Sequence, residues 1–267
     1  MRIGIIGKGI VGGALYHYLQ EYHDVSVYDP AKELWEGVRD RHVVFICVPA
    51  GTLARELSRD APLQDTTNLD AAFDYLDLEE YPKEYPVVIR STVLPGTADR
   101  YAERTKRFVV SMPEFLTERQ AGADILEQKH LICGGRGDLT MDRISALRSV
   151  FQDKLIHFMK NEEVELAKYA HNVFLSVKVN FWNIIRYTCV DMGLDYRTVA
   201  RAANLVTGFV GNEHTKVPGP DGKCGFGGKC FPKDSEAFNA WLSSLAIPNR
   251  SIEEMIRENH VFRGEEI

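Results

Sequence analysis

The sequence predicts an α/β fold: a doubly wound, mainly parallel sheet followed by an all-α domain with a long central helix. Short apolar runs typical of buried strands alternate with helical segments in the first part of the chain. A glycine-rich turn directly follows the first of these strands. Between Asn161 and Met192 the chain has neither proline nor glycine. The expected domains are therefore residues 1–159 and 160–267.

The first strand, residues 2–6, runs into Gly7, Gly9 and Gly12, and a helix is expected from there to about Gln20. These glycines have the spacing G-x-G-x-x-G in a strand–turn–helix setting. They allow a tight turn and the close approach of a pyrophosphate, and the helix N-terminus offers it free N–H groups. The pattern predicts a dinucleotide-binding (Rossmann) domain.

A second strand, residues 25–28, ends at Asp29. This acid lies about 20 residues beyond the glycines, where the fold places a carboxylate on the ribose hydroxyls and favours NAD over NADP. Lys32 lies close enough in sequence to tolerate a 2′-phosphate. The predicted cofactor is NAD, and the residues expected to contact it here are Gly7, Gly9, Ile10, Val11, Gly12, Asp29 and Lys32.

Five further apolar runs are expected to be strands: residues 43–48, 87–89, 108–110, 130–133 and 155–158. Ligands of a parallel sheet bind beyond the carboxyl ends of its strands. Several residues directly follow such ends, so we expect one cleft to collect them: Asp29, Pro49, Thr92 and Glu114.

The second half is predicted to contain one helix of about 30 residues from Asn161, capped by Gly193. Its apolar positions recur at helical spacing, so the helix must be covered on several sides, which predicts a homodimer through it. Lys168 and Asn172 are four residues apart and share a helix face, where they could hold a substrate oxygen.

The decapeptide Gly225–Asp234 places Cys230 in a glycine-rich turn between Lys229 and Lys233. Neighbouring lysines favour a thiolate, which is the reactive form of cysteine. The chain has five cysteines, scattered and odd in number, and a redox-sensitive disulfide between Cys224 and Cys230 is a weaker alternative. This usage, with no signal peptide evident, favours a reducing compartment and predicts a cytoplasmic protein.

Composition narrows the function further. The chain has 267 residues, a net charge of −6 and an ordinary hydrophobic fraction of 45%. The acidic balance argues against a nucleic-acid partner, and no apolar run is long enough to span a bilayer. No histidine pair accompanies the cysteines, so no metal site is expected.

These motifs resemble those of the UDP-glucose/GDP-mannose dehydrogenase family, and they occur in family order over nearly the whole chain. The matching segments are Gly7–Gly12, Cys47–Pro49, Ser91–Thr97, Pro113–Leu116, Glu165–Asn172 and Gly225–Asp234. The resemblance implies a double oxidation that converts the primary alcohol of a nucleotide sugar, most simply UDP-glucose, to a carboxylate with two NAD.

The resemblance also implies residue roles. Cys230 is the expected nucleophile, forming a thiohemiacetal and then a thioester, and Lys168 and Asn172 stabilise an oxyanion. Further expected catalytic residues are Asp234, Glu114 and Thr92. Further expected cofactor contacts are Val48, Pro49, Thr92, Glu118 and Lys233. The expected substrate contacts are Phe115, Leu116, Lys168, Asn172, Lys216, Gly225, Phe226, Gly227 and Gly228.

The sequence departs from the family pattern in three ways. The family has a third, nucleotide-binding domain, whereas this sequence stops at Ile267, just after what resembles the connecting helix, Ile252 to Phe262. Phe209 stands where the family has an arginine that reaches the partner subunit's substrate. Met112 stands where the family has an asparagine.

Two other functions stay open. One is a two-electron hydroxyacid dehydrogenase of the 3-hydroxyisobutyrate/6-phosphogluconate type, which also carries a lysine and an asparagine four apart on a long helix but needs no catalytic cysteine. The other is a catalytically inactive dimer that binds NAD.

Overall fold

The structure is a computed structural model that describes residues 1–52, 64–137, 139–205, 208 and 210–265, so Phe209 lies outside the described residues. The chain divides into two compact units, Met1–Lys168 and Tyr169–Ile267. The first contains a mainly parallel sheet and the second is helical, which confirms the predicted fold class. The domain boundary expected after residue 159 stays a prediction.

The main sheet of the first unit has the strand order β3-β2-β1-β4-β7-β8. Neighbouring strands are parallel except for the β2–β3 pair. The order reverses beside β1, where Ile3 pairs with Val25 on one side and with Val43 on the other. Such a reversal opens a crevice for ligands at the carboxyl ends of the strands. The strands are β1 (Arg2–Ile6), β2 (Asp24–Asp29), β3 (Leu34–Trp35), β4 (Val43–Ile46), β7 (Val87–Ile89) and β8 (Val109–Ser111).

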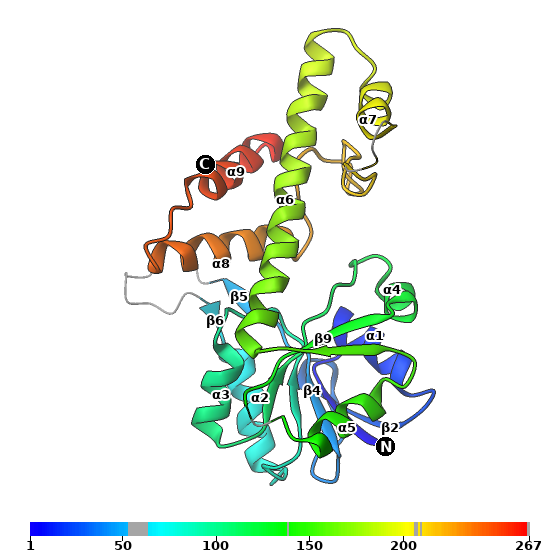
Figure 1. The fold of residues 1–267 in the computed structure, drawn as a ribbon, viewed down its shortest axis with the longest axis vertical. Coiled ribbons are helices and arrows are strands. Elements are labelled where there is room, and N and C mark those ends of the chain that lie inside the picture. The colour runs from blue at the N-terminus through cyan, green and yellow to red at the C-terminus, as the bar shows by residue number, and fades with distance from the viewer. Residues whose placement is uncertain (53–63, 138, 206–207, 209, 266–267) are drawn as a thin grey trace. The chain divides into compact units, whose positions relative to one another are not determined.

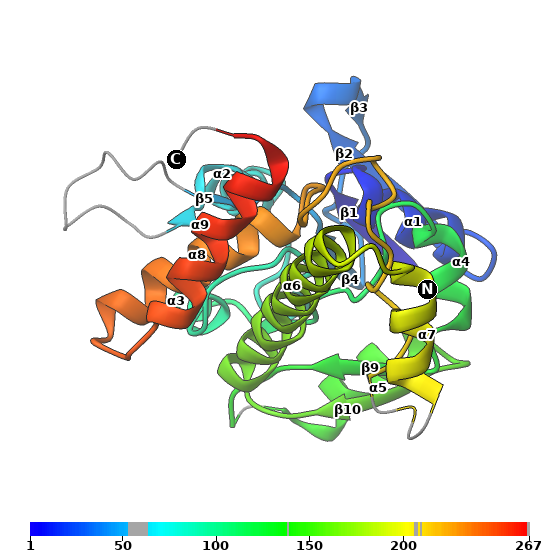
Figure 2. The same ribbon diagram turned by 90° about the horizontal axis from the view of Figure 1, so that it is seen from above.

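Helices cover both faces of this sheet (Figures 1 and 2). Alternate residues of β4 show it: Val43 and Phe45 belong to the apolar cluster formed with α1, α4 and α5, and Val44 and Ile46 to the cluster formed with α2 and α3. The sheet is therefore doubly wound, as predicted. The helices are α1 (Ile10–Leu19), α2 (Thr67–Leu78), α3 (Thr97–Thr105), α4 (Ala121–Glu127) and α5 (Met141–Val150).

Strands β9 (His130–Cys133) and β10 (Leu155–Phe158) lie where the sequence predicts strands, but they form a separate parallel pair. Apolar runs identify strands without telling which strands pair, so this second sheet was not foreseen. The first unit also contains a short antiparallel pair, β5 (Gly51–Thr52) and β6 (Gln64–Asp65), and a 3₁₀ turn, Pro30–Lys32.

Helix α6 (Asn161–Asp191) is 31 residues long, and Gly193, two residues beyond its end, has a φ of +67°. The second unit continues with α7 (Tyr196–Leu205), α8 (Phe231–Ser244) and α9 (Arg250–Arg263), and α8 and α9 lie side by side (Figure 1). Among the described residues, no helix is long and apolar enough to cross a membrane.

Candidate functional site

The glycine turn after β1 has the shape that a dinucleotide needs. Gly7 has a φ of +89°, in the left-handed region that favours glycine. A Cβ on Gly12 would lie 1.9 Å from the Gly7 carbonyl oxygen, so only glycine lets α1 pack this closely. A Cβ on Gly9 would meet no described atom within 4 Å. The first and third glycines therefore shape the turn, and the second leaves room for a pyrophosphate.

The start of α1 and the acid of β2 join at this turn. Within the described residues, no side chain caps the N-terminus of α1 at Gly9, so its N–H groups can receive an anion. The Lys8 N–H donates to Asp29 Oδ2 at 2.7 Å, and Lys32 Nζ donates to the Lys8 carbonyl oxygen. The structure thus brings together the glycine fingerprint, Asp29 and Lys32, and these residues fit the adenosine and pyrophosphate of NAD.

Two further loops at the carboxyl edge of the sheet are tied together. Ser91 Oγ donates to the Val48 carbonyl oxygen at 2.6 Å, which joins the loop after β7 to the loop after β4. The Thr92 carbonyl oxygen accepts from Gln64 Nε2 at 3.0 Å. Glu165 of α6 accepts from the N–H groups of Gly96 and Ala98, at 2.7 and 2.9 Å, where α3 begins. The segment that carries Thr92 is therefore held at several points.

Glu114, three residues beyond β8, is buried beside a buried cation, Lys168. Lys168 Nζ lies 3.6 Å from Glu114 Oε1 and 5.0 Å from the centre of the Phe115 ring. The Leu116 N–H donates to Glu114 Oε2 at 2.5 Å. Burial lowers the pKa of the Arg90 guanidinium, and the negative charge of Glu114 partly opposes that shift. The first unit therefore gathers Glu114, Phe115, Leu116 and Lys168 into one cluster.

In the second unit, a carboxylate is held by an amide and an ammonium group. Asn172 Nδ2 donates to Asp234 Oδ2 at 2.6 Å, and Lys233 Nζ donates to Asp234 Oδ1. Asn172 and Asp234 are 3% and 1% exposed, so this contact is shielded from water. Cys230 is half-buried and is the N-terminal cap of α8, and Asp234 lies in the first turn of that helix.

The cysteines differ in their surroundings. Burial raises the pKa of the Cys47 and Cys133 thiols to about 12, and both are unreactive as thiols. Cys189 is also buried, whereas Cys224 and Cys230 are half-buried. Of the residues that the structure describes, no group of three His, Cys, Asp or Glu side chains is arranged to hold a metal ion.

The remaining predicted residues are spread more widely. Glu118 and Lys216 are exposed, and Gly225 and Phe226 are buried in the turn that leads to Cys230. Four side chains that organise these loops were not predicted to do so: Gln64, Glu165, Asn183 and Asn259. For Asn183 and Asn259, the signal in the sequence was an asparagine at a helix position expected to be buried, because a buried amide needs hydrogen-bond partners.

The fold and these loops define a dinucleotide-binding protein whose helical unit presents a cysteine at a helix N-terminus. Residues 28–153 match the NAD binding domain of the UDP-glucose/GDP-mannose dehydrogenase family, and residues 162–261 match its central domain. The chain belongs to this family, and it contains the family's NAD-binding domain.

Individual relatives agree. The chain is 33% identical over 217 residues to the UDP-glucose 6-dehydrogenase of Pseudomonas aeruginosa, covering 76% of this chain and 45% of that protein. A UDP-glucose dehydrogenase structure from Pyrobaculum islandicum matches with a TM-score of 0.81 and 25% identity, covering 97% of this chain and 68% of that one. The chain spans about half the length of the UDP-glucose 6-dehydrogenases that it matches.

A 3-hydroxyisobutyrate dehydrogenase structure from Mycobacterium tuberculosis also matches, with a TM-score of 0.72. The match covers 99% of this chain and 95% of that one, but the identity is 15%, so it shows a shared fold alone.

Proposed function

We propose that this protein catalyses the NAD-dependent oxidation of a nucleotide-sugar primary alcohol to the carboxylate, most simply of UDP-glucose to UDP-glucuronate. The observation that carries the proposal is Cys230 at the start of α8, in a chain with the family's NAD-binding and central domains. A helix N-terminus favours an anion, so this thiol stands where a thiolate nucleophile is stabilised.

The chemistry takes two oxidations. In the first, the alcohol loses a hydride and a proton and becomes an aldehyde. The Cys230 thiolate adds to the aldehyde carbon, and the new C–S bond gives a hemithioacetal. Loss of a second hydride, together with the hydroxyl proton, gives a thioester. Water then adds to the thioester carbon and breaks the C–S bond, which releases the carboxylate, a proton and the thiol. NAD, when bound, accepts one hydride per molecule, so two are consumed for each sugar.

Lys168 and Asn172 support this chemistry from helix α6. The Lys168 ammonium group and the Asn172 amide can both donate to an oxygen that becomes negative, which is the electrostatic role of an oxyanion site. Asp234 accepts from Asn172 and so fixes the direction of its amide. Glu114, whose Oε1 lies 3.6 Å from Lys168 Nζ, is the proposed base that activates the water of the last step. Thr92 is the second residue proposed to act near that water.

NAD is proposed to bind along the carboxyl edge of the sheet in the first unit. The turn at Gly7–Gly12 would take the pyrophosphate and Asp29 the ribose hydroxyls. The loops after β4 and β7 are the proposed neighbours of the nicotinamide half. The proposed contacts outside the fingerprint are Lys32, Val48, Pro49, Thr92, Glu118 and Lys233.

The proposed substrate class follows from the relatives, which are named for UDP-glucose. The residues proposed to contact the sugar nucleotide are Phe115, Leu116, Lys168, Asn172, Lys216, Gly225, Phe226, Gly227 and Gly228. Backbone groups of the Gly225–Gly228 turn suit sugar hydroxyls, because glycine lets the backbone approach a ligand closely.

A homodimer through α6 is part of the proposal. The helix exposes a row of apolar side chains that water would not favour: Phe174, Val177, Phe181 and Ile184. The described cysteines form no disulfide, which suits the reducing, cytoplasmic compartment that we propose.

The deciding experiment measures NADH and acid production together. The purified protein is given NAD with UDP-glucose, UDP-N-acetylmannosamine, GDP-mannose or a free sugar phosphate, and the acid is quantified by mass spectrometry. We expect two NADH for each acid formed from one of the nucleotide sugars.

Two results would replace this proposal with its alternatives. One NADH per substrate, unchanged in Cys230→Ala, would indicate a two-electron hydroxyacid dehydrogenase, whose fold this chain shares. NAD binding by calorimetry, without turnover of any substrate in the panel, would indicate an inactive NAD-binding protein.

A further inference from the structure

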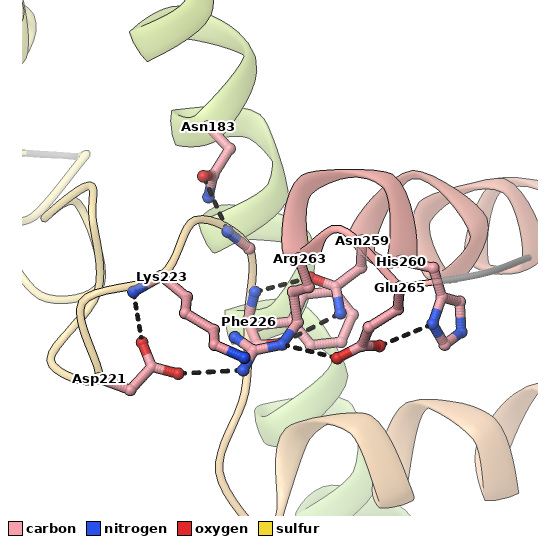
Figure 3. Close-up of polar contacts among 9 residues, drawn as sticks. Asn183, Asp221, Lys223, Phe226, Asn259, His260, Arg263 and Glu265 are labelled. Carbon is pink, nitrogen blue, oxygen red and sulfur yellow. Dashed lines mark hydrogen bonds and ion pairs between the residues drawn. The ribbon is translucent and has the colours of Figure 1, made fainter.

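The turn that leads to Cys230 is held by asparagine side chains from two helices (Figure 3). The Gly225 N–H donates to Asn183 Oδ1 of α6 at 2.9 Å. Asn259 of α9 makes two bonds to one residue: Oδ1 accepts from the Phe226 N–H at 2.7 Å, and Nδ2 donates to the Phe226 carbonyl oxygen at 3.0 Å. Helix α9 therefore satisfies both backbone groups of Phe226.

Burial makes these bonds hard to replace. Phe226 is 3% exposed and Asn259 is 4% exposed, so water cannot readily take the place of either partner. A primary amide carries a donor and an acceptor in one plane, and it matches the N–H and C=O of a peptide group. A carboxylate in its place would set an oxygen against the Phe226 carbonyl, and an aliphatic side chain would leave both groups unpaired.

The last turns of α9 also fit the glycine turn closely. A Cβ on Gly225, whose φ is +77°, would lie 2.5 Å from Asn259 Oδ1. A Cβ on Gly227 would lie 2.6 Å from Arg263 Nη1. Arg263 is itself held by Asp221, at 3.1 Å, and by Glu265, at 3.2 Å (Figure 3). The turn has little freedom to move while α9 is in place.

Cys230 follows the Gly225–Gly228 turn after one residue, Lys229, and α8 begins directly beyond it. A change in the path of residues 225–228 would therefore change where the thiol and the first turn of α8 lie. We propose that Asn259 is a positioning residue that holds the Gly225–Gly228 turn and thereby sets the place of Cys230. The link to catalysis rests on the proposed function, whereas the link to the turn does not.

The test compares Asn259→Ala and Asn259→Asp with a matched control, Asn180→Ala. Asn180 is also a buried asparagine between α6 and α9, and its Nδ2 donates to Glu258 Oε2 at 2.7 Å. Among the described residues, Asn180 makes no hydrogen bond to the Gly225–Gly228 turn. Two measurements report on the Gly225–Gly228 turn and need no enzymatic activity. They are the hydrogen exchange of a peptide covering residues 224–230 and the rate of Cys230 alkylation by iodoacetamide.

We expect exchange in this peptide to become at least about tenfold faster in both Asn259 variants and to stay as in the wild type in Asn180→Ala. Alkylation of Cys230 should change in the same two variants only. With an active nucleotide sugar, kcat for acid formation should fall roughly tenfold in the two Asn259 variants while KM for NAD stays unchanged.

Wild-type exchange in the Asn259 variants would overturn the proposal, and so would equal acceleration in Asn180→Ala, which would assign the effect to general α6–α9 packing. If Asn259→Ala does not fold, Asn259→Asp carries the comparison, since it keeps the side-chain volume. Absence of turnover in the wild type would contradict the proposed function, and the exchange data would still decide the role of Asn259.

Discussion

The two units fill their interiors with different kinds of side chain. The sheet of the first unit packs valine, isoleucine and aromatic residues into an apolar cluster on each face. The apolar cluster found in the second unit is small and centres on Trp182, Cys189, Tyr196 and Val217. The second unit instead buries hydrogen-bonded asparagines, namely Asn172, Asn180, Asn183, Asn239 and Asn259.

The two kinds of buried side chain contribute differently to the stability of the fold and to the positions of its loops. Apolar burial contributes most of the free energy of folding but tolerates substitutions that keep volume. A buried amide contributes little net free energy, yet it demands partners at set distances and so fixes where loops lie. The first unit is therefore a scaffold for a cofactor, and the second holds a thiol and its neighbours in place.

The largest expected effect is a loss of acid formation, which depends on the second unit, without a loss of NAD binding, which depends on the first. Cys230→Ser should lower acid formation roughly ten-thousand-fold, because serine cannot replace the thiolate. The affinity of this variant for NAD should be unchanged, because the Gly7–Gly12 turn that is proposed to bind NAD lies in the first unit. Acid yield and calorimetric NAD binding measure the two effects. Cys224→Ser is the matched control, a half-buried cysteine six residues earlier that should keep activity.

Glu165, like Glu114, is a carboxyl group buried in the first unit, and it is 1% exposed. Burial raises its pKa from 4.5 to about 8, and hydrogen bonds from Ala98 and Gly96 oppose the shift. The folded protein holds this proton more tightly than the unfolded chain. Glu165 therefore stabilises the fold fully below about pH 4.5, and this contribution is lost as the pH rises through about 8.

The free energy of unfolding should accordingly fall by up to about 5 kcal/mol over that interval on account of Glu165. Urea unfolding at several pH values measures it, and Glu165→Gln should remove most of the slope. The exposed neighbour Glu162 gives the control Glu162→Gln, which should keep the wild-type slope. An unchanged slope in Glu165→Gln would contradict the expected titration.

Gly12→Ala tests how little space the first unit leaves at its turn. The added Cβ would lie 1.9 Å from the Gly7 carbonyl oxygen, so the free energy of unfolding should fall by about 3 kcal/mol and NAD affinity should drop. Gly13→Ala is the control, because its Cβ meets no described atom within 4 Å. This variant should gain about 0.5–1 kcal/mol from helix propensity. Equal stability of the two variants would show that the turn relaxes.

The smallest expected effect concerns the exposed apolar row of α6. Phe181→Asp should weaken self-association by about 2 kcal/mol, roughly thirtyfold in the dissociation constant, because a charge would enter the proposed interface. Light scattering over a dilution series measures it. Val261→Asp is the control, an exposed apolar residue of α9 that is 59% accessible. A wild type that is monomeric throughout the series would refute the interface.

Local patterns predicted much of the fold. The strand at residues 2–6 and the helix from Asn161 have the expected bounds within a residue, because each depends on nearby apolar spacing and on glycine caps. The second sheet of β9 and β10 was missed, since pairing joins distant segments. The contact of Glu165 with Gly96 spans 69 residues and was missed for the same reason. Motifs thus indicated which residues matter, but not which partners orient them.

The burial of Cys47 and Cys133 has a practical consequence. With thiol pKa values raised to about 12, neither forms an appreciable amount of thiolate at neutral pH. Mild peroxide or a soft electrophile should therefore leave both intact and mark the half-buried cysteines first. The mass added by a covalent thiol probe would then measure how many protein molecules still carry reactive half-buried cysteines. Oxidation that inactivates the protein would leave the apolar interior of the first unit unmodified.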